Sequence, residues 1–331
     1  MRILLYHPVK LPVLQYGGTE RVLMWLAQTL LKKGHQVTVF AAPGSSMPDG
    51  IECLTDPAQL LACLKNFDVV HGFTKLSSAI ENDSQGRVMV TIHGNGKWGE
   101  KFHRNTVFLS RDHAIRHGAT EFVYNGIDPR ELLFNEAPRA DRCLFLSKTS
   151  LRVKNAKGAA RIASRCKQNL WIAGGDRPIS LRTFTSLKKM MGADWKWLGS
   201  LDQKQKAQFL IEGKALLFPI LWNEPFGLVI MESLVSGTPV LANGYGSVPE
   251  LLSFAPHCVM KSDAEWKQAL MSGMTLPSAK VCRDWVMSTF TQDHMTENYL
   301  KLYEKVAAGK FLHDKEPETK VGAEEIKRFT P

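Results

Sequence analysis

The sequence predicts an α/β protein of two lobes, each a Rossmann-like, doubly wound parallel sheet with helices on both faces. The chain has 331 residues, which is longer than a single core usually grows, so two domains are expected. Its composition, 44% hydrophobic and 22% charged, is ordinary for a globular protein. Short apolar runs alternate with helix-like runs along the whole chain, an order typical of parallel sheets with crossover helices.

The first lobe is predicted to begin with a strand at Arg2–Tyr6 and a helix at residues 20–33, which Gly34 ends. The apolar residues of this helix recur at helical spacing: Val22, Leu23, Leu26, Ala27, Leu30 and Leu31. Further strands are expected at residues 37–41, 69–70, 88–92, 107–109 and 122–124.

A linker of mixed polarity at residues 135–142 precedes a second series of the same kind. Its strands are expected at residues 143–146, 170–173, 195–198, 215–218, 240–242 and 258–260. Its helices are expected to begin near residues 157, 203, 227, 263 and 278, and a long amphipathic helix covers residues 292–306. The first lobe then spans residues 1–140 and the second 141–290. Residues 311–331 are charged and poor in aliphatic side chains, which predicts a loosely ordered tail.

Charge and targeting signals narrow the function classes. The net charge is +10, and residues 147–310 hold 22 Lys and Arg against 13 Asp and Glu, a bias that suits phosphate-bearing ligands or anionic lipid. Basic runs interleaved with aromatic residues are missing, so nucleic acid is not expected as a partner. The sequence shows no secretory signal and no apolar stretch near 20 residues, and its six cysteines form no C-x-x-C pair. We therefore expect a cytoplasmic protein, a monomer or weak dimer, with peripheral membrane contact left open.

The strongest pattern is a pair of carboxylates, Glu224 and Glu232, in the segment 224–233. Pro225 is favoured in the first turn of a helix, so Glu224 is expected in the loop just before a helix whose amide groups point at any bound anion. Glu232 lies inside this helix, which is apolar almost all round, so its charge requires hydrogen-bond partners. Ligand hydroxyl groups would supply them, and the alternative is a structural glutamate satisfied by backbone amides.

Lysines follow the first strand of the second lobe. Lys148 comes directly after this strand, and Lys154 and Lys157 follow it. Such cations can bind a diphosphate, and surface lysines on a loop are the alternative.

Glycines and histidines stand where strands of the first lobe end. Gly17 and Gly18 separate the first strand from the first helix, where they let the backbone approach a phosphate closely. His71 and His93 each follow a strand, and ligands of parallel sheets bind beyond the carboxyl ends of strands. A simple tight turn and satisfied structural histidines are the alternatives, and His71 is expected to shape a pocket.

The segment from Glu224 to Glu232 resembles the E-x7-E signature of the retaining glycosyltransferases of family 4, which have the GT-B fold. The resemblance covers about residues 1–306. It implies two Rossmann-like lobes facing a deep cleft, an acceptor lobe first and a nucleotide-sugar donor lobe second. It also implies that the helix in residues 291–310 crosses back to the first lobe, that Glu224 contacts the transferred sugar, and that Glu232 contacts the ribose.

The resemblance gives roles to the other candidates. Family members usually carry Gly-Arg at the positions of Ser147 and Lys148 and a lysine several residues later in the sequence. The arginine and this lysine bind the diphosphate. Here Lys148 supplies a point charge without the bidentate fork of arginine. Lys154 fits the spacing of the second cation best, and Lys157 is its rival. The implied catalytic residues are His93, Glu224, Lys148 and Lys154. The implied donor-binding residues are Gly17, Gly18, Gly199, Ser200, Leu201, Phe226, Gly227, Leu228 and Glu232.

We therefore expect a hexosyltransferase of carbohydrate biosynthesis, which moves a sugar from a UDP-, GDP- or ADP-sugar to a hydroxyl of a glycan, lipid-linked or small-molecule acceptor with retention. The sequence has no D-x-D pair, so neither a metal nor another cofactor is expected, and cations and helix amino ends stabilise the leaving diphosphate. A nucleotide-sugar epimerase of the same fold and a non-catalytic nucleotide-sugar-binding protein are the alternatives. A nicotinamide dehydrogenase is disfavoured because the Gly17-Gly18 turn is not part of a G-x-G-x-x-G pattern.

Overall fold

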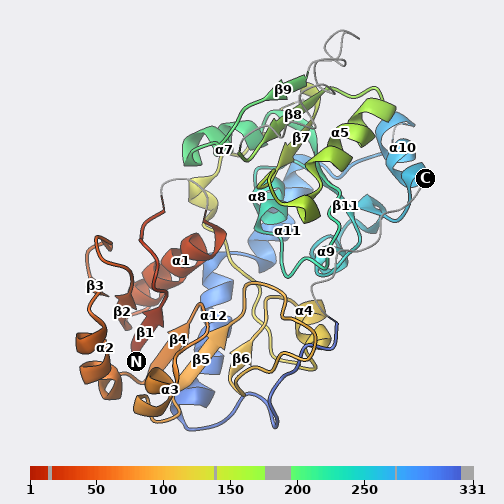
Figure 1. Cartoon of the computed structure of the whole chain (residues 1–331). Helices are drawn as coiled ribbons and strands as arrows, with labels where there is room; N and C mark the ends of the chain where they lie inside the picture. Colours follow the sequence, from red (N-terminus) through yellow and green to blue (C-terminus); the bar gives the residue numbers. More distant parts are fainter. Residues whose placement is uncertain (14–16, 138–139, 176–194, 273, 322–331) are drawn as a thin grey trace. The chain divides into compact units, whose positions relative to one another are not determined.

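The computed structural model describes residues 1–13, 17–137, 140–175, 195–272 and 274–321. These residues form two compact units (Figure 1). The first comprises Met1–Ile127 and the described residues from Phe290 on, and the second comprises Asp128–Thr289. Each unit contains one six-stranded sheet in which all the pairings are parallel. The predicted α/β fold class is confirmed.

The first sheet has the order β3-β2-β1-β4-β5-β6. Its strands are β1 (Arg2–Tyr6), β2 (Gln36–Phe40), β3 (Ile51–Leu54), β4 (Val69–Gly72), β5 (Val88–Thr91) and β6 (Thr106–Val107). The helices of this unit are α1 (Gly18–Lys32), α2 (Pro57–Cys63), η1 (Leu64–Asn66), α3 (Ser78–Asp83), α4 (Arg111–Arg116) and α12 (Gln292–Ala307).

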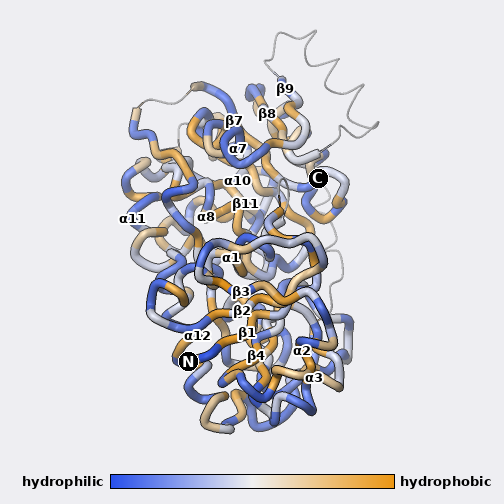
Figure 2. The backbone as a smooth tube through the Cα atoms, turned by 90° about the vertical axis from the view of Figure 1, so that its left-hand side faces the viewer, coloured by the Kyte–Doolittle hydropathy of each residue, from blue (hydrophilic) through white to orange (hydrophobic). Residues whose placement is uncertain are grey.

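Helices cover both faces of this sheet (Figure 1). On one face, α1 and α12 pack against each other and against the strands. On the other face, Leu60 of α2 and Ile80 of α3 join Leu4 of β1 and Val70 of β4 in one apolar core. Figure 2 shows how the apolar residues concentrate in the central strands, as expected for a sheet buried on both sides.

The second sheet has the order β12-β11-β10-β7-β8-β9. Its strands are β7 (Ala140–Leu146), β8 (Leu170–Ala173), β9 (Trp195–Trp197), β10 (Gly213–Phe218), β11 (Val240–Asn243) and β12 (Val259–Met260). The described residues of this unit form the helices η2 (Pro129–Glu131), η3 (Arg152–Lys154), α5 (Ala156–Arg165), α7 (Gln203–Leu210), α8 (Leu228–Val235), α9 (Val248–Leu251), η4 (Pro256–Cys258), α10 (Asp263–Met271) and α11 (Ala279–Thr289).

Each sheet reverses its strand order once. In the first unit the chain moves outward from β1 to β2 and β3, then returns to place β4 on the other side of β1. In the second unit it moves outward from β7 to β8 and β9, then places β10 beside β7. At such a reversal the connections leave the carboxyl ends of neighbouring strands in opposite directions, which opens a crevice where ligands of open α/β sheets bind.

Several details differ from the sequence-based expectations. The predicted strand at 122–124 is absent, because Phe122 forms only a single bridge to Phe108. The edge strand β3 (Ile51–Leu54) was not predicted, since the four-residue run is interrupted by Glu52 and gives little alternation. The second compact unit also begins at Asp128, whereas the predicted boundary lies at residue 141.

The segment after α12 differs as well. Composition predicts a loosely ordered tail from residue 311, but Leu312 and Thr319 are buried against the first unit. The backbone N–H of Leu312 donates to Asn105 Oδ1 at 2.9 Å, and Thr319 N–H donates to the carbonyl of Glu100 at 2.9 Å. A few anchoring contacts therefore order this polar segment without an aliphatic core of its own. The remainder of the predicted tail, residues 322–331, lies outside the described residues.

The described part of the chain offers no helix with both the length and the apolar character needed to cross a bilayer.

Candidate functional site

A buried ion pair joins the carboxyl ends of the two central strands of the second sheet. Lys154 ends η3, which follows β7, and Glu224 lies in the loop that follows β10. Because β7 and β10 are parallel neighbours, both loops emerge at the same edge. Lys154 Nζ lies 2.6 Å from Glu224 Oε2, and the two side chains are 11% and 7% exposed.

The position of the Glu224 carboxylate is fixed from several sides. Trp222 Nε1 donates a hydrogen bond of 2.7 Å to the same oxygen, Oε2, that Lys154 contacts. The backbone of Glu224 pairs with Gly246 in an isolated parallel bridge, and Ser247 N–H donates to its carbonyl at 2.9 Å. Gly246 has a φ of +63°, and a Cβ there would lie 2.3 Å from the backbone nitrogen of Glu224. The glycine of this loop is therefore required for the close approach that holds Glu224 in place.

A second buried pair lies in the same unit. Glu232 lies within α8 and is 3% exposed, and its Oε1 is 2.6 Å from the Nζ of Lys206 on α7. Lys206 is itself 8% exposed, so both charges of this pair are removed from water. Burial of a charged group is tolerated only with a partner of opposite charge, which each supplies to the other.

The amino end of α8 follows Glu224 directly. Gly227 caps this helix in the left-handed region, with a φ of +92°, and contributes no side chain to the first-turn amides. The expectation that Pro225 lies in the first turn of this helix is wrong. Pro225 precedes the helix, because the left-handed Gly227 caps it and the helical backbone begins only at Leu228. Phe226 is buried, and its carbonyl accepts a hydrogen bond of 2.7 Å from Ser247 Oγ. The amides of Leu228 and its successors thus form an amino end suited to an anion.

The other predicted cations occupy different environments. Lys148 is exposed two residues after β7, at the same edge of the sheet as Lys154. Lys157 is exposed on the first turn of α5. Of the two rivals for the second phosphate cation, only Lys154 lies beside Glu224.

The loops after β8 and β9 complete this edge of the second unit. Gly174 has a φ of +119°, and a Cβ on it would lie 1.9 Å from the carbonyl oxygen of Ser147. Gly199, the first of the three residues expected at the nucleobase, has a φ of +70°, and its carbonyl accepts a hydrogen bond of 2.8 Å from Gly174 N–H. Ser200 and Leu201 follow it before α7 and are exposed and half-buried, respectively. The predicted residues of these loops thus lie close to the loop that carries Lys148, since β7, β8 and β9 are consecutive strands of the sheet.

In the first unit, polar side chains surround the amino end of α1. Gly17 caps this helix without a side-chain hydrogen bond, and Gly18 is its first residue. A Cβ on Gly17 would lie 2.8 Å from Glu20 Oε2. His7, which follows β1, places its Nε2 3.9 Å from Glu20 Oε1, and this neighbouring imidazole lowers the pKa of Glu20. The carboxylate is therefore ionised near neutral pH.

His93 follows β5 and stacks on Phe73, with ring centroids 5.2 Å apart. Burial lowers its pKa to about 3, so the imidazole is neutral near pH 7. Its buried Nε2 has no hydrogen-bond partner among the described residues. His71 differs, because its two ring nitrogens are bonded to Tyr303 and Thr91 at 2.7 and 2.8 Å.

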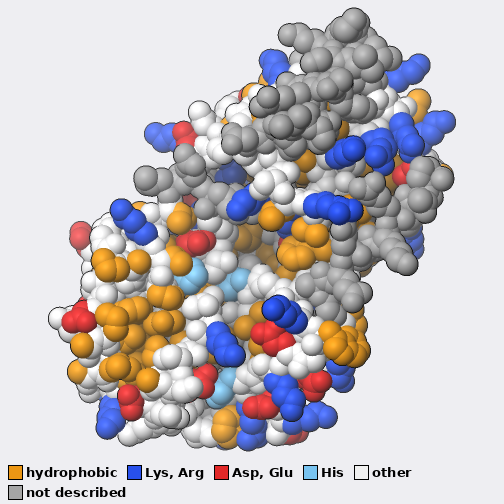
Figure 3. All heavy atoms as spheres, in the orientation of Figure 1, with side chains coloured by type: hydrophobic (Ala, Val, Ile, Leu, Met, Phe, Trp, Pro, Cys, Tyr) orange, Lys and Arg blue, Asp and Glu red, His pale blue; other side chains and the backbone are white. Residues whose placement is uncertain are grey.

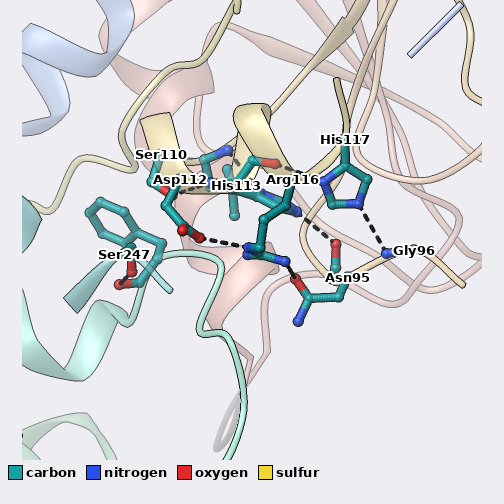
Figure 4. A network of polar contacts seen from close by, with 11 residues as sticks. Asn95, Gly96, Ser110, Asp112, His113, Arg116, His117 and Ser247 are labelled. Atoms are coloured by element: carbon teal, nitrogen blue, oxygen red, sulfur yellow. Dashed lines mark hydrogen bonds and ion pairs between the residues drawn. The ribbon is translucent and has the colours of Figure 1, made fainter. Parts of the chain in front are cut away.

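The loop that follows His93 is held by α4, as Figure 4 shows. Arg116 donates to Asn95 Oδ1 at 2.8 Å and forms an ion pair of 2.6 Å with Asp112 one turn earlier. Gly96 N–H donates to His117 Nε2 at 3.2 Å. Since these bonds fix the two loop residues, the backbone beside His93 is set by the packing of α4 rather than by the loop itself.

Sequence reasoning missed Lys206, Trp222 and His7. Lys206 had a usable signal, because it stands at helical spacing with Phe209 and Leu210 on the buried face of α7. A lysine on such a face requires an acidic partner, which here comes from a helix 26 residues away in sequence.

Within the described residues, no three His, Cys, Asp or Glu side chains are grouped as metal ligands would be.

Comparisons with known proteins bear on this arrangement. Residues 135–269 match the family described as Glycosyl transferases group 1. The chain is 30% identical over 113 residues to an uncharacterized 41.2 kDa protein in the cps region of Klebsiella pneumoniae, a match that covers 32% of this chain and 31% of that relative.

Solved structures match most of the chain at low sequence identity. The chain superposes on AviGT4, a glycosyltransferase involved in avilamycin A biosynthesis, with a TM-score of 0.73 and 22% identity, over 93% of this chain and 98% of that one. It also superposes on Anabaena Alr3699/HepE, solved in complex with UDP-glucose, with a TM-score of 0.65 and 15% identity, over 93% and 100% of the two chains. The expected GT-B fold is confirmed.

Proposed function

We propose that the chain is a glycosyltransferase whose second unit binds a nucleotide-sugar donor, because residues 135–269 match the family described as Glycosyl transferases group 1. The observation that carries this proposal is the pair of buried lysine–glutamate contacts that involve Glu224 and Glu232. Apolar side chains of similar volume often stabilise a fold as well as a buried ion pair does. Two such pairs on adjacent segments, next to the uncapped amino end of α8, therefore favour a role in ligand binding.

Donor binding requires groups that accept the charge of a diphosphate. Lys148 and Lys154 supply cations from the loop after β7, and the amides at the start of α8 supply partial positive charge. A hydrogen bond to a charged group contributes about 1.5–3 kcal/mol. We assign Glu232 to the ribose hydroxyls, the backbone of Gly199, Ser200 and Leu201 to the base, and Glu224 to the transferred sugar. UDP-, GDP- and ADP-sugars are the donor classes that this arrangement would accept.

The reaction breaks the bond between the anomeric carbon and the diphosphate oxygen and forms a bond from that carbon to the acceptor oxygen. We propose that the configuration is retained, with the acceptor attacking from the face that the diphosphate leaves. The departing phosphate oxygen then takes the acceptor proton, so that no separate base is required. Lys148, Lys154 and the start of α8 stabilise the negative charge that develops on the diphosphate.

We assign the acceptor side to the first unit. His93 is neutral near pH 7, and its enclosed Nε2 has no partner among the described residues, although buried polar groups are nearly always hydrogen-bonded. A sugar or acceptor hydroxyl would supply this partner. His71 is already bonded on both ring nitrogens, so we assign it to the support of the pocket.

Replacing Lys154 tests the proposed role in turnover. Lys154→Ala should lower the rate of nucleoside diphosphate release from the donor by about two orders of magnitude, since one cation that stabilises transition-state charge is lost. This release can be measured without a known acceptor as the slow hydrolysis of the donor, with UDP-, GDP- and ADP-sugars supplied in turn.

Lys204→Ala is the matched control, because Lys204 is an exposed lysine of α7. Its rate should equal that of the wild type. A normal rate for Lys154→Ala, combined with a large loss for Lys157→Ala, would transfer the assignment to the rival lysine.

The proposed mechanism uses no metal ion. Adding EDTA should therefore leave the rate of donor cleavage unchanged, because lysines and helix amides neutralise the diphosphate. A strong loss of rate that Mg²⁺ restores would contradict this part of the proposal.

A further inference from the structure

A second basic pocket lies between α5 and α10 of the second unit. It is a cavity of about 300 Å³. Its apolar lining includes Ile162, Leu221 and Trp266. Four cations and one carboxylate also line it: Lys157, Arg161, Arg165, Lys267 and Asp263. Figure 3 shows Lys and Arg side chains gathered over the same helices.

The pocket is separated from the proposed donor site by a shared wall. Asn155 Nδ2 donates to the carbonyl of Pro219 at 2.8 Å, and Leu221 N–H donates to the carbonyl of Val153 at 2.8 Å. These bonds join the loop after β7 to the loop after β10. Lys154 and Glu224 belong to the same two loops but do not line the pocket.

Most of the positive charge in the pocket is uncompensated. Arg165 Nη1 lies 2.7 Å from Asp263 Oδ2, which neutralises one cation. Within the described part of the chain, Lys157, Arg161 and Lys267 have no carboxylate within ion-pair distance. The pocket therefore keeps an excess of three positive charges around an apolar floor.

The charges on α5 oppose the stability of the helix itself. Lys157, Arg161 and Arg165 are spaced four residues apart, so they lie on one face, and like charges at this spacing destabilise a helix by about 0.2–0.5 kcal/mol per pair. Lys157 also lies in the first turn, where the helix dipole favours anions, and that turn has no acidic residue. Each of these effects would be reversed by an anion bound in the pocket.

We propose that the pocket between α5 and α10 binds a phosphate-bearing ligand other than the donor nucleotide-sugar. Phosphate matches the site because Arg161 can form bidentate hydrogen bonds to it and the lysines supply point charges. The apolar floor accepts an uncharged part of the same molecule. The ligand is either a soluble phosphorylated compound or the phosphate headgroup of a lipid, and both present the same group to the pocket.

Calorimetric titration of the full chain with inorganic pyrophosphate tests the proposal. In the wild type saturated with UDP, we expect pyrophosphate still to bind, because UDP fills only the donor site. The combined variant Lys157→Gln, Arg161→Gln and Lys267→Gln should weaken this remaining binding at least tenfold. The matched control is Lys204→Gln, Lys214→Gln and Lys280→Gln, which removes the same charge elsewhere in the second unit and should bind as the wild type does.

The outcomes separate this proposal from the proposed function. Lys154→Ala should weaken binding of UDP and leave pyrophosphate binding in the pocket intact. The proposal is overturned if pyrophosphate does not bind once UDP is saturating, or if the pocket variant and the control bind it equally. If the pocket variant loses UDP binding and Lys154→Ala keeps it, this pocket is instead the donor site.

A second arm identifies the source of the phosphate. Flotation with vesicles of phosphatidylcholine and phosphatidylglycerol is compared between the wild type and the pocket variant. Vesicle binding that the pocket variant loses assigns the pocket to a lipid headgroup, and pyrophosphate binding without vesicle binding assigns it to a soluble ligand.

Discussion

At the scale of single residues, the site of the second unit depends on two glutamates that are each neutralised by a lysine from another element. Glu224 is paired with Lys154 of η3, and Glu232 is paired with Lys206 of α7. Removing one partner of a buried pair leaves a charge without compensation and costs about 3–5 kcal/mol. Each lysine therefore offsets the cost of burying its carboxylate and holds that carboxylate in place for a ligand.

Substitution of Lys206 separates the effect of the ion pair on stability from the proposed role of Glu232 in ligand binding. Lys206→Met should lower the free energy of unfolding of the second unit by about 3 kcal/mol, because the Glu232 carboxylate loses its lysine. Adding Glu232→Gln should recover most of this loss, because the amide carries no charge to bury. Urea denaturation of the wild type, the two single variants and the double variant gives the coupling between the side chains.

The double variant should still bind UDP more weakly than the wild type, since it lacks the proposed ribose ligand. Additive effects of the two substitutions on stability would show that the ion pair contributes nothing.

At the scale of elements, the carboxyl ends of β7, β8, β9 and β10 bring four loops to one edge. Glycines with positive φ shape several loops at this edge of the sheet: Gly174 after β8, Gly199 after β9, Gly227 after β10 and Gly246 after β11. Gly174 is the most constrained, because its missing Cβ makes room for the carbonyl of Ser147. The position of Lys148, the residue after Ser147, depends on this contact.

Replacement of Gly174 should therefore be costly. Gly174→Ala introduces a Cβ at a positive φ, which costs about 1–2 kcal/mol, and adds a collision with the Ser147 backbone. Gly199→Ala is the matched control, since Gly199 has a positive φ of +70° but no atom within 4 Å of the added Cβ. Urea denaturation should show a larger loss of stability for Gly174→Ala, and equal losses would mean that the loop moves without cost.

The elements also show what the sequence could predict. The strands β1 and β10 were predicted because they are continuous apolar runs, and α12 was predicted because its helical period is clear over many residues. The edge strand β3 was missed, and 122–124 was mistaken for a strand, because runs of three or four residues carry almost no period. Lys206 escaped because its partner comes from distant sequence, whereas the positions of Glu224 and Glu232 followed from a local pattern.

At the scale of the whole molecule, the first unit contains several buried histidines that burial keeps neutral. Burial lowers the pKa of four histidines in the folded unit, which are His71, His93, His113 and His117. The unfolded chain takes up protons at histidines near pH 6.5. In the folded unit these four histidines take up protons only at lower pH, so below pH 6.5 the unfolded state binds more protons at them, and stability falls as the pH falls toward their folded pKa values.

Acidification should therefore weaken the first unit. For His93, whose pKa is lowered to about 3, the loss between pH 7 and pH 5 is about 2 kcal/mol. Hydrogen exchange of peptides from β4 and β5, corrected for the intrinsic exchange rate, measures this unit separately. His93→Gln should reduce the pH dependence, and His257→Gln should not, because His257 is exposed in the second unit. Equal protection at the two pH values would contradict the burial of neutral histidines.

The central claim is that the carboxyl edge of the second sheet holds the diphosphate of a nucleotide-sugar. A crystal structure of the full chain with UDP, or with GDP or ADP where one of these stabilises the protein more, tests it most directly. We expect Lys148, Lys154 and the start of α8 to contact the diphosphate, and the Glu232 carboxylate to accept hydrogen bonds from the ribose. A nucleotide bound with its diphosphate away from Lys154, or with its ribose away from Glu232, would overturn the assignment of this edge as the donor site.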